Sequence, residues 1–221
     1  MSSRPLRLAY VGFALLGAAV LGAFVYDRAF RAPVTAPEPA PRAARDAPEP
    51  PTSVPSMLPS VTLKDLDGQT HSLTDGGGKA LVINFWATWC APCRREIPLL
   101  NRISREYAGK GFEVVGIAVD FADDVRAFTR DFPLQYRLLI GEEDGLAAAR
   151  AFGVATMAFP FTAFSDVRGR IITVHLGELH PAQAEAILGV VGRVNSGEIS
   201  PETARVAIGA ALNRLQRPAE S

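Results

Sequence analysis

Apolar and polar residues alternate in blocks that predict strands and helices in turn from residue 60 onward. Residues 80–87 and 112–119 are apolar almost throughout and of strand length, as expected for strands buried on both faces. Residues 94–107, which lie between them, carry apolar side chains at helical spacing. This order predicts a parallel strand–helix–strand crossover unit, right-handed by default.

The rest of this region continues the alternation. Residues 61–73 predict a small hairpin with Asp67-Gly68 at its turn. The further elements that we expect are strands at 136–140, 161–164 and 171–176, and helices at 123–132, 145–152 and 181–194.

A last helix is predicted after Ser200, which is a suitable N-cap followed by a proline. Its narrow apolar stripe consists of Ala204, Ile208, Ala211 and Leu215. We expect the stripe to dock on the chain's own domain, because surface helices usually face their own core. The alternative is a helix that binds a partner.

The N-terminal part has a different pattern. Residues 8–26 are uncharged over 19 positions, and a helix of that length would span roughly 28 Å, close to the hydrocarbon thickness of a bilayer. Arg4 and Arg7 precede the run, and positive charge favours a cytoplasmic location for residues 1–7. We therefore predict an uncleaved transmembrane anchor at 8–26. A cleaved signal peptide is the alternative, but its apolar region is usually about 7–15 residues long.

A Pro/Ala-rich linker is predicted at residues 27–56. Nine of the chain's 17 prolines fall within residues 31–59, with almost no large apolar side chain among them. Such a segment cannot build a core and suits a spacer that holds a domain away from a membrane. An ordered arm packed on the domain is the alternative. The folded domain is then expected at 57–195, followed by a C-terminal helical extension at 196–221.

Composition limits the classes of function. The 23 lysines and arginines balance 23 aspartates and glutamates, so bulk charge does not favour a nucleic-acid partner. Two cysteines are too few for a disulfide-rich scaffold or a four-cysteine zinc site. They stand three positions apart, as Cys90-Ala91-Pro92-Cys93, between a predicted buried strand and a predicted helix.

This position indicates redox chemistry. A helix N-terminus has free N–H groups and a positive dipole end, which stabilise a thiolate. Thiolates are the nucleophiles of thiol–disulfide exchange, and cysteines in such motifs titrate at roughly 3.5–7.5 instead of about 8.5. We predict Cys90 as the exposed attacking thiol and Cys93 as the more buried resolving thiol. Pro92 removes a backbone donor in the first turn and should tune the thiolate.

Other uses of the two cysteines are less favoured. A zinc half-site would need further ligands, and His175 and His180 have zinc-like spacing but lie far outside the usual separation from the cysteines. An inert structural disulfide would close a very small loop and gain little stability. Two merely buried cysteines would not need this spacing at a helix start.

The segment FWATWCAPCRREIP, residues 85–98, resembles the active-site segment of the thioredoxin superfamily. It is most similar to that of the membrane-anchored bacterial TlpA, ResA and CcmG group, and the resemblance extends over about residues 57–194. It implies an α/β, thioredoxin-like three-layer fold, in which helices flank a central mixed sheet. An N-terminal transmembrane helix and an extra C-terminal helix complete the expected architecture.

The resemblance also implies roles for residues around the cysteines. Pro160 corresponds to the family's cis-proline, which borders the substrate groove; an ordinary trans proline at the start of an edge strand is the alternative. The residues implied to contact the substrate are Trp89, Ala91, Pro92 and Phe159.

A proton acceptor is implied as well. Glu96 matches a glutamate three residues past the second cysteine in ResA- and TlpA-type proteins, where it would accept a proton or tune a thiol pKa. A solvated glutamate on the helix surface is the equal alternative. Asn84 stands where thioredoxin has a buried aspartate, and it cannot take up a proton at neutral pH. Three residues are interpreted as surface or turn positions: His71, His175 and His180.

The function expected from these features is a periplasm-facing, membrane-tethered thiol–disulfide oxidoreductase without metal or cofactor. The resemblance implies a reductant for apocytochrome c haem-site thiols or for copper-assembly proteins, with a membrane electron donor of the DsbD or CcdA type. A disulfide-forming oxidase and a non-redox binding or chaperone module remain alternatives. A thiol peroxidase is disfavoured, because Ile83 and Ala87 stand where the peroxidatic motif requires proline and threonine.

Overall fold

The computed structural model describes residues 53–75, 77–154 and 158–216, all of which belong to one compact unit. The predicted anchor at 8–26 and most of the predicted linker lie outside the described residues. In the part of the chain that is described, no helix has the length and apolar character needed to cross a membrane.

One mixed sheet of seven strands forms the centre, in the order β2-β1-β5-β4-β3-β6-β7. The central strands β5, β4 and β3 are parallel, and the outer pairings are antiparallel. The strands are β1 (Thr62–Lys64), β2 (Thr70–Ser72), β3 (Ala80–Trp86), β4 (Phe112–Ala118), β5 (Arg137–Ile140), β6 (Phe161–Ser165) and β7 (Ile171–Leu176).

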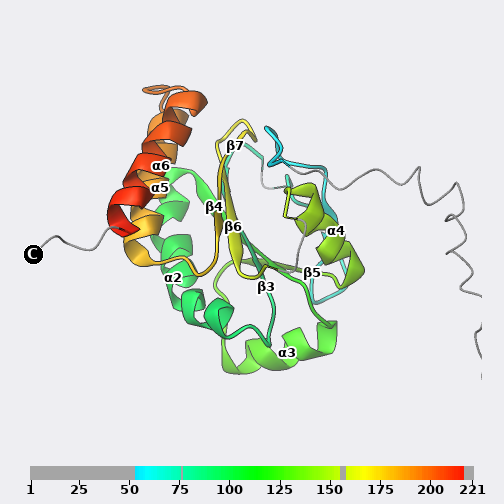
Figure 1. Cartoon of the computed structure of the whole chain (residues 1–221). Helices are drawn as coiled ribbons and strands as arrows, with labels where there is room; N and C mark the ends of the chain where they lie inside the picture. Colours follow the sequence, from blue (N-terminus) through cyan, green and yellow to red (C-terminus); the bar gives the residue numbers. More distant parts are fainter. Residues whose placement is uncertain (1–52, 76, 155–157, 217–221) are drawn as a thin grey trace, which may run out of the picture. The chain divides into compact units, whose positions relative to one another are not determined.

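Helices cover both faces of this sheet. The helices are α2 (Ala91–Tyr107), α3 (Ala122–Asp131), α4 (Glu143–Ala151), α5 (Pro181–Asn195) and α6 (Pro201–Gln216), with a short 3-10 turn η2 (Ala108–Lys110) after α2. Figure 1 shows α2, α5 and α6 on one side of the sheet and α4 on the other. The three-layer thioredoxin-like α/β architecture predicted from the sequence is therefore present.

The apolar runs explain the layers. Every residue of β3 is buried, which agrees with its position in the middle of the sheet and with a sequence that is apolar except at Asn84. On the α4 face, Phe85 stacks on Phe161 with ring centroids 4.4 Å apart, and Phe152 meets Phe85 edge-on. On the opposite face, α2 and α5 bury their apolar residues against β3 and β4.

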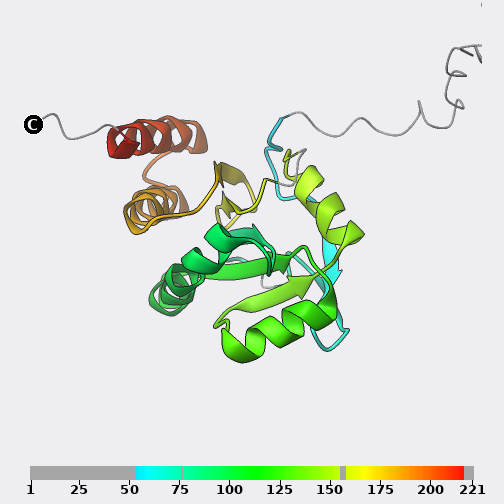
Figure 2. The same cartoon turned by 60° about the horizontal axis from the view of Figure 1, so that its bottom comes forward.

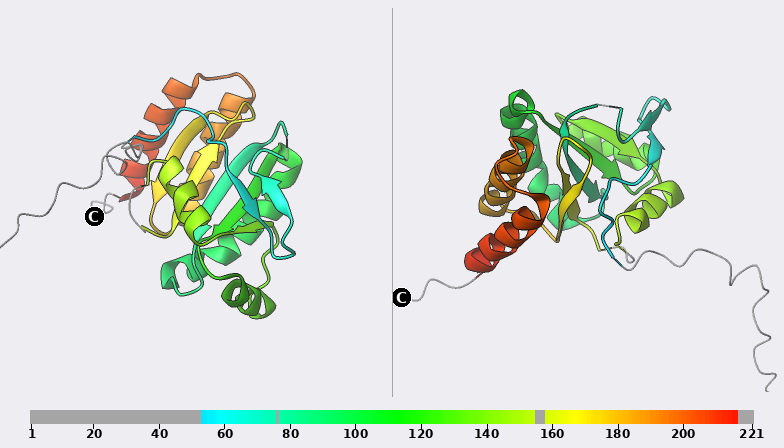
Figure 3. Two further views of the ribbon diagram at one scale, coloured as in Figure 1. Left: turned by 90° about the vertical axis from the view of Figure 1, so that its right-hand side faces the viewer. Right: turned by 90° about the horizontal axis from the view of Figure 1, so that it is seen from above.

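The C-terminal helix α6 docks on the domain, as its apolar stripe predicts. It contacts α5 and β7, and Figure 2 and Figure 3 show it lying beside α5. Ala204 and Ile208 are buried in this contact, whereas Leu215 at the far end is 47% exposed. The hydroxyl of Ser200 accepts a hydrogen bond from the Thr203 N–H, so the expected N-cap is also formed.

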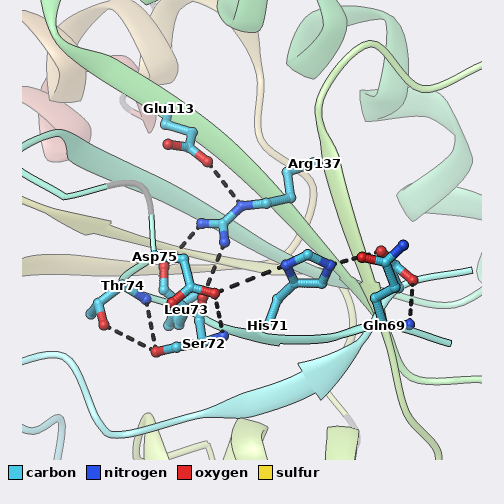
Figure 4. A network of polar contacts seen from close by, with 9 residues as sticks. Gln69, His71, Ser72, Leu73, Thr74, Asp75, Glu113 and Arg137 are labelled. Atoms are coloured by element: carbon cyan, nitrogen blue, oxygen red, sulfur yellow. Dashed lines mark hydrogen bonds and ion pairs between the residues drawn. The ribbon is translucent and has the colours of Figure 1, made fainter. Parts of the chain in front are cut away.

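A polar network attaches the β1–β2 hairpin to the parallel strands (Figure 4). The guanidinium of Arg137 donates to the carbonyl oxygens of Ser72 and Leu73, at 3.1 and 2.9 Å. It also pairs with the Glu113 carboxylate on β4 at 2.8 Å. This arginine provides charged donors for two carbonyl oxygens at the end of β2. It thereby links the hairpin to β5, which carries Arg137, and to β4, which carries Glu113.

Two features differ from the sequence expectations. Helix α2 begins at Ala91, three residues before the predicted start, because Cys90 is its N-cap and Pro92 suits its first turn. His175 is not a surface or turn residue: it lies on β7, is 9% exposed and has its Nε2 3.3 Å from the Glu178 carbonyl oxygen. Its alternating position on the strand directs it inward, and burial lowers its pKa.

Backbone hydrogen bonds connect β7 and the turn before it with the last residue of the predicted linker and with the residues that follow it. The Ile171 N–H donates to the Ser56 carbonyl at 2.9 Å, and the Leu58 N–H donates to the Gly169 carbonyl at 2.8 Å. The segment from Ser56 therefore already runs against the start of β7.

Candidate functional site

The cysteine pair lies where β3 ends and α2 begins. Cys90 is the N-cap of α2, with φ −83° and ψ 104°, and its sulfur accepts a hydrogen bond from the Cys93 N–H at 3.3 Å. The two cysteines form a disulfide, with their Cα atoms 5.3 Å apart. The sulfur of Cys90 thus occupies the place of an N-capping oxygen, where backbone N–H groups and the helix dipole stabilise negative charge.

A second contact holds the loop that carries these cysteines. Asp120, two residues after the end of β4, accepts hydrogen bonds from the Thr88 N–H at 3.0 Å and from the Thr88 hydroxyl at 2.6 Å. Its other carboxylate oxygen accepts from the Phe121 N–H at 2.9 Å. This contact, the Thr88–Asp120 clamp, was not predicted from the sequence. A carboxylate shortly after β4, the neighbour of the strand that leads to the cysteines, could have suggested it.

Cys93 is the more buried of the two cysteines, as expected, but Cys90 is itself buried in the disulfide form and is not the exposed thiol that the sequence predicted. Cys93 is fully buried and Cys90 is 5% exposed. Trp89, in contrast, is 61% exposed, and its ring lies 6.4 Å from that of Phe159. Phe159 packs against the cluster that contains both cysteines. The residue before Cys90 therefore presents an exposed aromatic ring, next to the half-buried Phe159.

The peptide bond between Phe159 and Pro160 is cis. Pro160 is buried, and its carbonyl accepts a hydrogen bond from the Gly177 N–H at 2.8 Å. An ordinary trans proline, the alternative left open by the sequence, is therefore excluded. The bond precedes β6, which pairs directly with β3, the strand that leads to the cysteines. The function of Pro160 in a substrate groove stays a prediction.

Glu96 is a buried residue, so the interpretation as a solvated surface glutamate was wrong. It is 1% exposed, on the inner side of α2. Its carboxylate accepts one hydrogen bond from the Asn84 side-chain amide at 2.7 Å and another from the Leu179 N–H at 2.8 Å. The same Asn84 amide donates to the Thr162 hydroxyl at 3.0 Å. The glutamate is therefore connected to β3, to β6 and to the loop before α5.

This environment changes the proton affinity of Glu96. Burial raises its pKa from 4.5 to about 7, the two hydrogen bonds oppose this rise, and the nearby charge of Glu178 adds to it. Residue Glu96 is also among those that line a groove of about 380 Å³, which is bordered by Arg95 and Glu178, an ion pair. A carboxyl group with a pKa of about 7 can gain or lose a proton near neutral pH.

The remaining candidate residues do not form a metal site. Among residues 53–75, 77–154 and 158–216, no group of three or more histidine, cysteine, aspartate or glutamate side chains is arranged to hold a metal ion. Of the predicted substrate contacts, Ala91 is exposed and Pro92 is half-buried at the start of α2. The described site therefore combines a disulfide at a helix N-terminus with the buried carboxyl groups of Glu96 and Asp120.

Known proteins share this arrangement. The AhpC/TSA family profile matches residues 54–174. The thioredoxin-like protein YneN of Bacillus subtilis (strain 168) is 35% identical over 135 residues, which covers 58% of this chain and 75% of that protein. The thiol-disulfide oxidoreductase ResA of Geobacillus thermodenitrificans (strain NG80-2) is 34% identical over 128 residues, covering 58% of this chain and 71% of ResA.

Solved structures agree. A proposed thiol:disulfide interchange protein DsbE of Chlorobium tepidum is 25% identical with a TM-score of 0.53, and the match covers 72% of this chain and 98% of that one. A secreted thiol-disulfide isomerase of Corynebacterium glutamicum is 30% identical with a TM-score of 0.53, covering 58% and 80%. The chain therefore belongs to the AhpC/TSA family and is a thiol–disulfide oxidoreductase of the ResA and DsbE type with a thioredoxin-like fold.

Proposed function

We propose that this oxidoreductase works as a protein-disulfide reductase, anchored in the inner membrane with its domain in the periplasm. The observation that carries the proposal is the Cys90–Cys93 pair at the start of α2, with the buried Glu96 one turn further on. This combination provides a nucleophile, a resolving thiol and a proton acceptor that works near neutral pH.

The proposed reaction begins with the dithiol form. The Cys90 thiolate attacks a disulfide of the partner protein, which forms a mixed disulfide and releases one partner thiolate. Cys93 then transfers its proton to the Glu96 carboxylate and attacks the Cys90 sulfur. The internal disulfide forms, the second partner thiolate leaves, and two electrons have passed to the partner.

The proposed substrates are apocytochrome c haem-site cysteines or copper-site cysteines of an oxidase assembly protein. The resemblance to the TlpA, ResA and CcmG group supports this class, and the exposed Trp89 beside the half-buried Phe159 suits an extended cysteine-bearing segment. The oxidised enzyme would be reduced again by a membrane dithiol donor of the DsbD or CcdA type. The uncharged run at 8–26 and the proline-rich residues behind it support the anchored location.

The direction of electron flow is tested by trapping free thiols in the native host. Cells are quenched with acid, and thiols are labelled with a mass tag before the protein is resolved on a gel. A reductase is mostly in the Cys90/Cys93 dithiol form, and it becomes oxidised when the membrane donor is deleted. A protein that is mostly oxidised in both strains would contradict the proposal and favour a disulfide-forming oxidase.

The binding-module alternative has its own test. A Cys90→Ser strain that retains cytochrome c and oxidase assembly would show that the cysteines are incidental. The reductase proposal requires that this strain lose the same function as a deletion strain.

A further inference from the structure

Two buried polar atoms have no hydrogen-bond partner among the described residues: the indole Nε1 of Trp86 and the hydroxyl of Tyr136. Trp86 is fully buried. The third atom of this kind, Arg137 Nε, faces the Glu113 carboxylate at 2.8 Å and is explained by that ion pair. Buried donors are rarely left unpaired in proteins, because an unmade hydrogen bond is costly.

The Tyr136 ring and the indole nitrogen of Trp86 both lie against Gly116. A Cβ atom at Gly116 would come within 2.8 Å of the Tyr136 ring and within 3.3 Å of Trp86 Nε1. The absence of a side chain at this β4 position therefore leaves the space that Tyr136 fills. Any larger residue would separate the hydroxyl-bearing ring from the indole.

The same place in the sheet carries the Glu96 network. Asn84 pairs with Gly116 across β3 and β4, so both face α2. Trp86 is two residues further along β3 and lies on the same face. Glu96 enters this layer from α2 and accepts the Asn84 amide at 2.7 Å. The charge of Glu96 also contributes to raising the pKa of Tyr136, after burial as the larger cause.

We propose that Trp86 and Tyr136 hold one internal water molecule that also binds the Glu96 carboxylate, which makes Tyr136 a positioning residue for the proton acceptor. The water accepts the indole N–H and the tyrosine O–H, and it donates to the carboxylate. Internal waters in proteins bind at polar sites of this kind, with two to four partners that would otherwise be unpaired.

The consequence concerns the proton affinity of Glu96, and it rests on the proposed function in which this carboxylate accepts the Cys93 proton. A donor on the carboxylate stabilises its charged form and lowers its pKa. Without the water, the pKa of Glu96 would be higher. More of the glutamate would then already be protonated at neutral pH, and less carboxylate would be available to accept the Cys93 proton. The other charged or titratable groups around Glu96 are Glu178, Arg95, Arg102 and His180, and Cys93 precedes it by three residues on α2.

The first test detects the water itself in the oxidised protein. The chain has two tryptophans, so the two indole N–H signals can be assigned with a Trp89→Phe variant. A bound water beside Trp86 gives a cross-peak between its indole N–H and a long-lived water in nuclear magnetic resonance spectra. Trp89, which is 61% exposed, provides the internal control and shows only rapidly exchanging solvent. No long-lived water at Trp86 would overturn the proposal.

The second test removes the hydroxyl. In Tyr136→Phe the Trp86–water cross-peak is lost, and the Glu96 pKa, followed by the ¹³C shift of its carboxyl carbon, rises by about 0.5–1 unit. Tyr107→Phe, which removes a hydroxyl at a tyrosine packed against the same core layer, leaves both signals unchanged. An equal Glu96 pKa in Tyr136→Phe and wild type would contradict the proposal.

Both readouts use the disulfide form and need no thiol exchange. The outcome of these two measurements therefore does not depend on whether the protein is a reductase. If Tyr136→Phe does not fold, the wild-type cross-peak still decides whether the water is present.

Discussion

At the scale of single residues, the site depends on where two sulfur atoms and one carboxyl group lie. Cys90 takes the place of an N-cap side chain, and its sulfur already accepts the Cys93 N–H in the oxidised form. A thiolate at this position gains the same hydrogen bond and the favourable end of the helix dipole. Cys93 lies inside the helix and is fully buried.

This difference predicts the order of alkylation. In the reduced protein near neutral pH, iodoacetamide should modify Cys90 before Cys93, because Cys90 is more accessible and its thiolate is better stabilised. Peptide mass spectrometry after a short reaction measures the order, and the unfolded protein, in which both thiols react alike, is the control. Preferential labelling of Cys93 would overturn the assignment of the two roles.

The carboxyl group of Glu96 should influence the thiols. In Glu96→Gln the neutral amide no longer repels a nearby thiolate, so the pKa of a cysteine thiol is expected to fall. The ultraviolet absorbance of the thiolate as a function of pH measures this shift in the reduced protein. Glu106→Gln, at an exposed position of the same helix, is the matched control. Identical thiol titrations in wild type and Glu96→Gln would show that the carboxylate does not act on the cysteines.

At the scale of elements, most strands and helices followed directly from the apolar pattern. β3, β4 and β7 lie within one residue of the predicted bounds, because long apolar runs and the flanking turn residues mark them clearly. The start of α2 was predicted late, since cysteine is not a usual N-cap residue and no polar cap marks position 90. Helix starts that depend on a sulfur atom give little signal in sequence.

The site was less predictable than the elements. The Thr88–Asp120 clamp joins residues 32 positions apart, and its one signal in the sequence is that each residue follows one of two neighbouring predicted strands. The burial of Glu96 was left open because a glutamate in the first turns of a helix is usually solvated and favours the dipole. Only the tertiary structure brings Asn84 and the Leu179 N–H to its carboxylate.

Helix α6 provides a prediction about packing. Ile208 is 2% exposed in the contact with α5, so Ile208→Ala should lower the free energy of unfolding by about 2–4 kcal/mol through lost contacts and a cavity. Val206→Ala, on the same helix at a position 75% exposed, should change it by less than about 0.5 kcal/mol. Urea unfolding of both variants measures the difference. Equal effects would mean that α6 does not dock in solution as described.

At the scale of the whole molecule, the buried glutamate connects function with stability. The folded protein holds the Glu96 proton up to about pH 7, whereas the unfolded chain releases it near pH 4.5. Between these values the folded state binds more protons, so the free energy of unfolding falls as the pH rises. The decrease attributable to Glu96 is on the order of 3 kcal/mol, complete near pH 7 and absent below about pH 4.5.

This pH dependence is measured by urea unfolding of the oxidised protein, in which the cysteines do not titrate. His175 acts in the opposite direction, because its lowered pKa favours the folded state as the pH rises toward 6.5. The contribution of Glu96 is therefore obtained as the difference between wild type and Glu96→Gln at each pH. A constant difference from pH 4.5 to 7.5 would contradict the raised pKa.

The composition of the whole chain acquires a definite meaning in this structure. Two cysteines are sufficient because they form one disulfide at the start of α2. Asn84 stands where thioredoxin has a buried aspartate, and Glu96, which accepts a hydrogen bond from Asn84, provides a buried carboxyl group next to it. With a net charge of zero, partner choice is expected to depend on the aromatic surface around Trp89 more than on overall charge.

The central claim is that Cys90 attacks a partner's disulfide and Cys93 resolves the mixed disulfide. Its most direct test is expression of Cys93→Ser in the native host, followed by acid quenching and non-reducing electrophoresis. We predict a mixed disulfide through Cys90 with a cysteine-containing partner, visible as a larger species that dithiothreitol removes and that Cys90→Ser does not form. No trapped species in Cys93→Ser, or the same species in Cys90→Ser, would contradict the account.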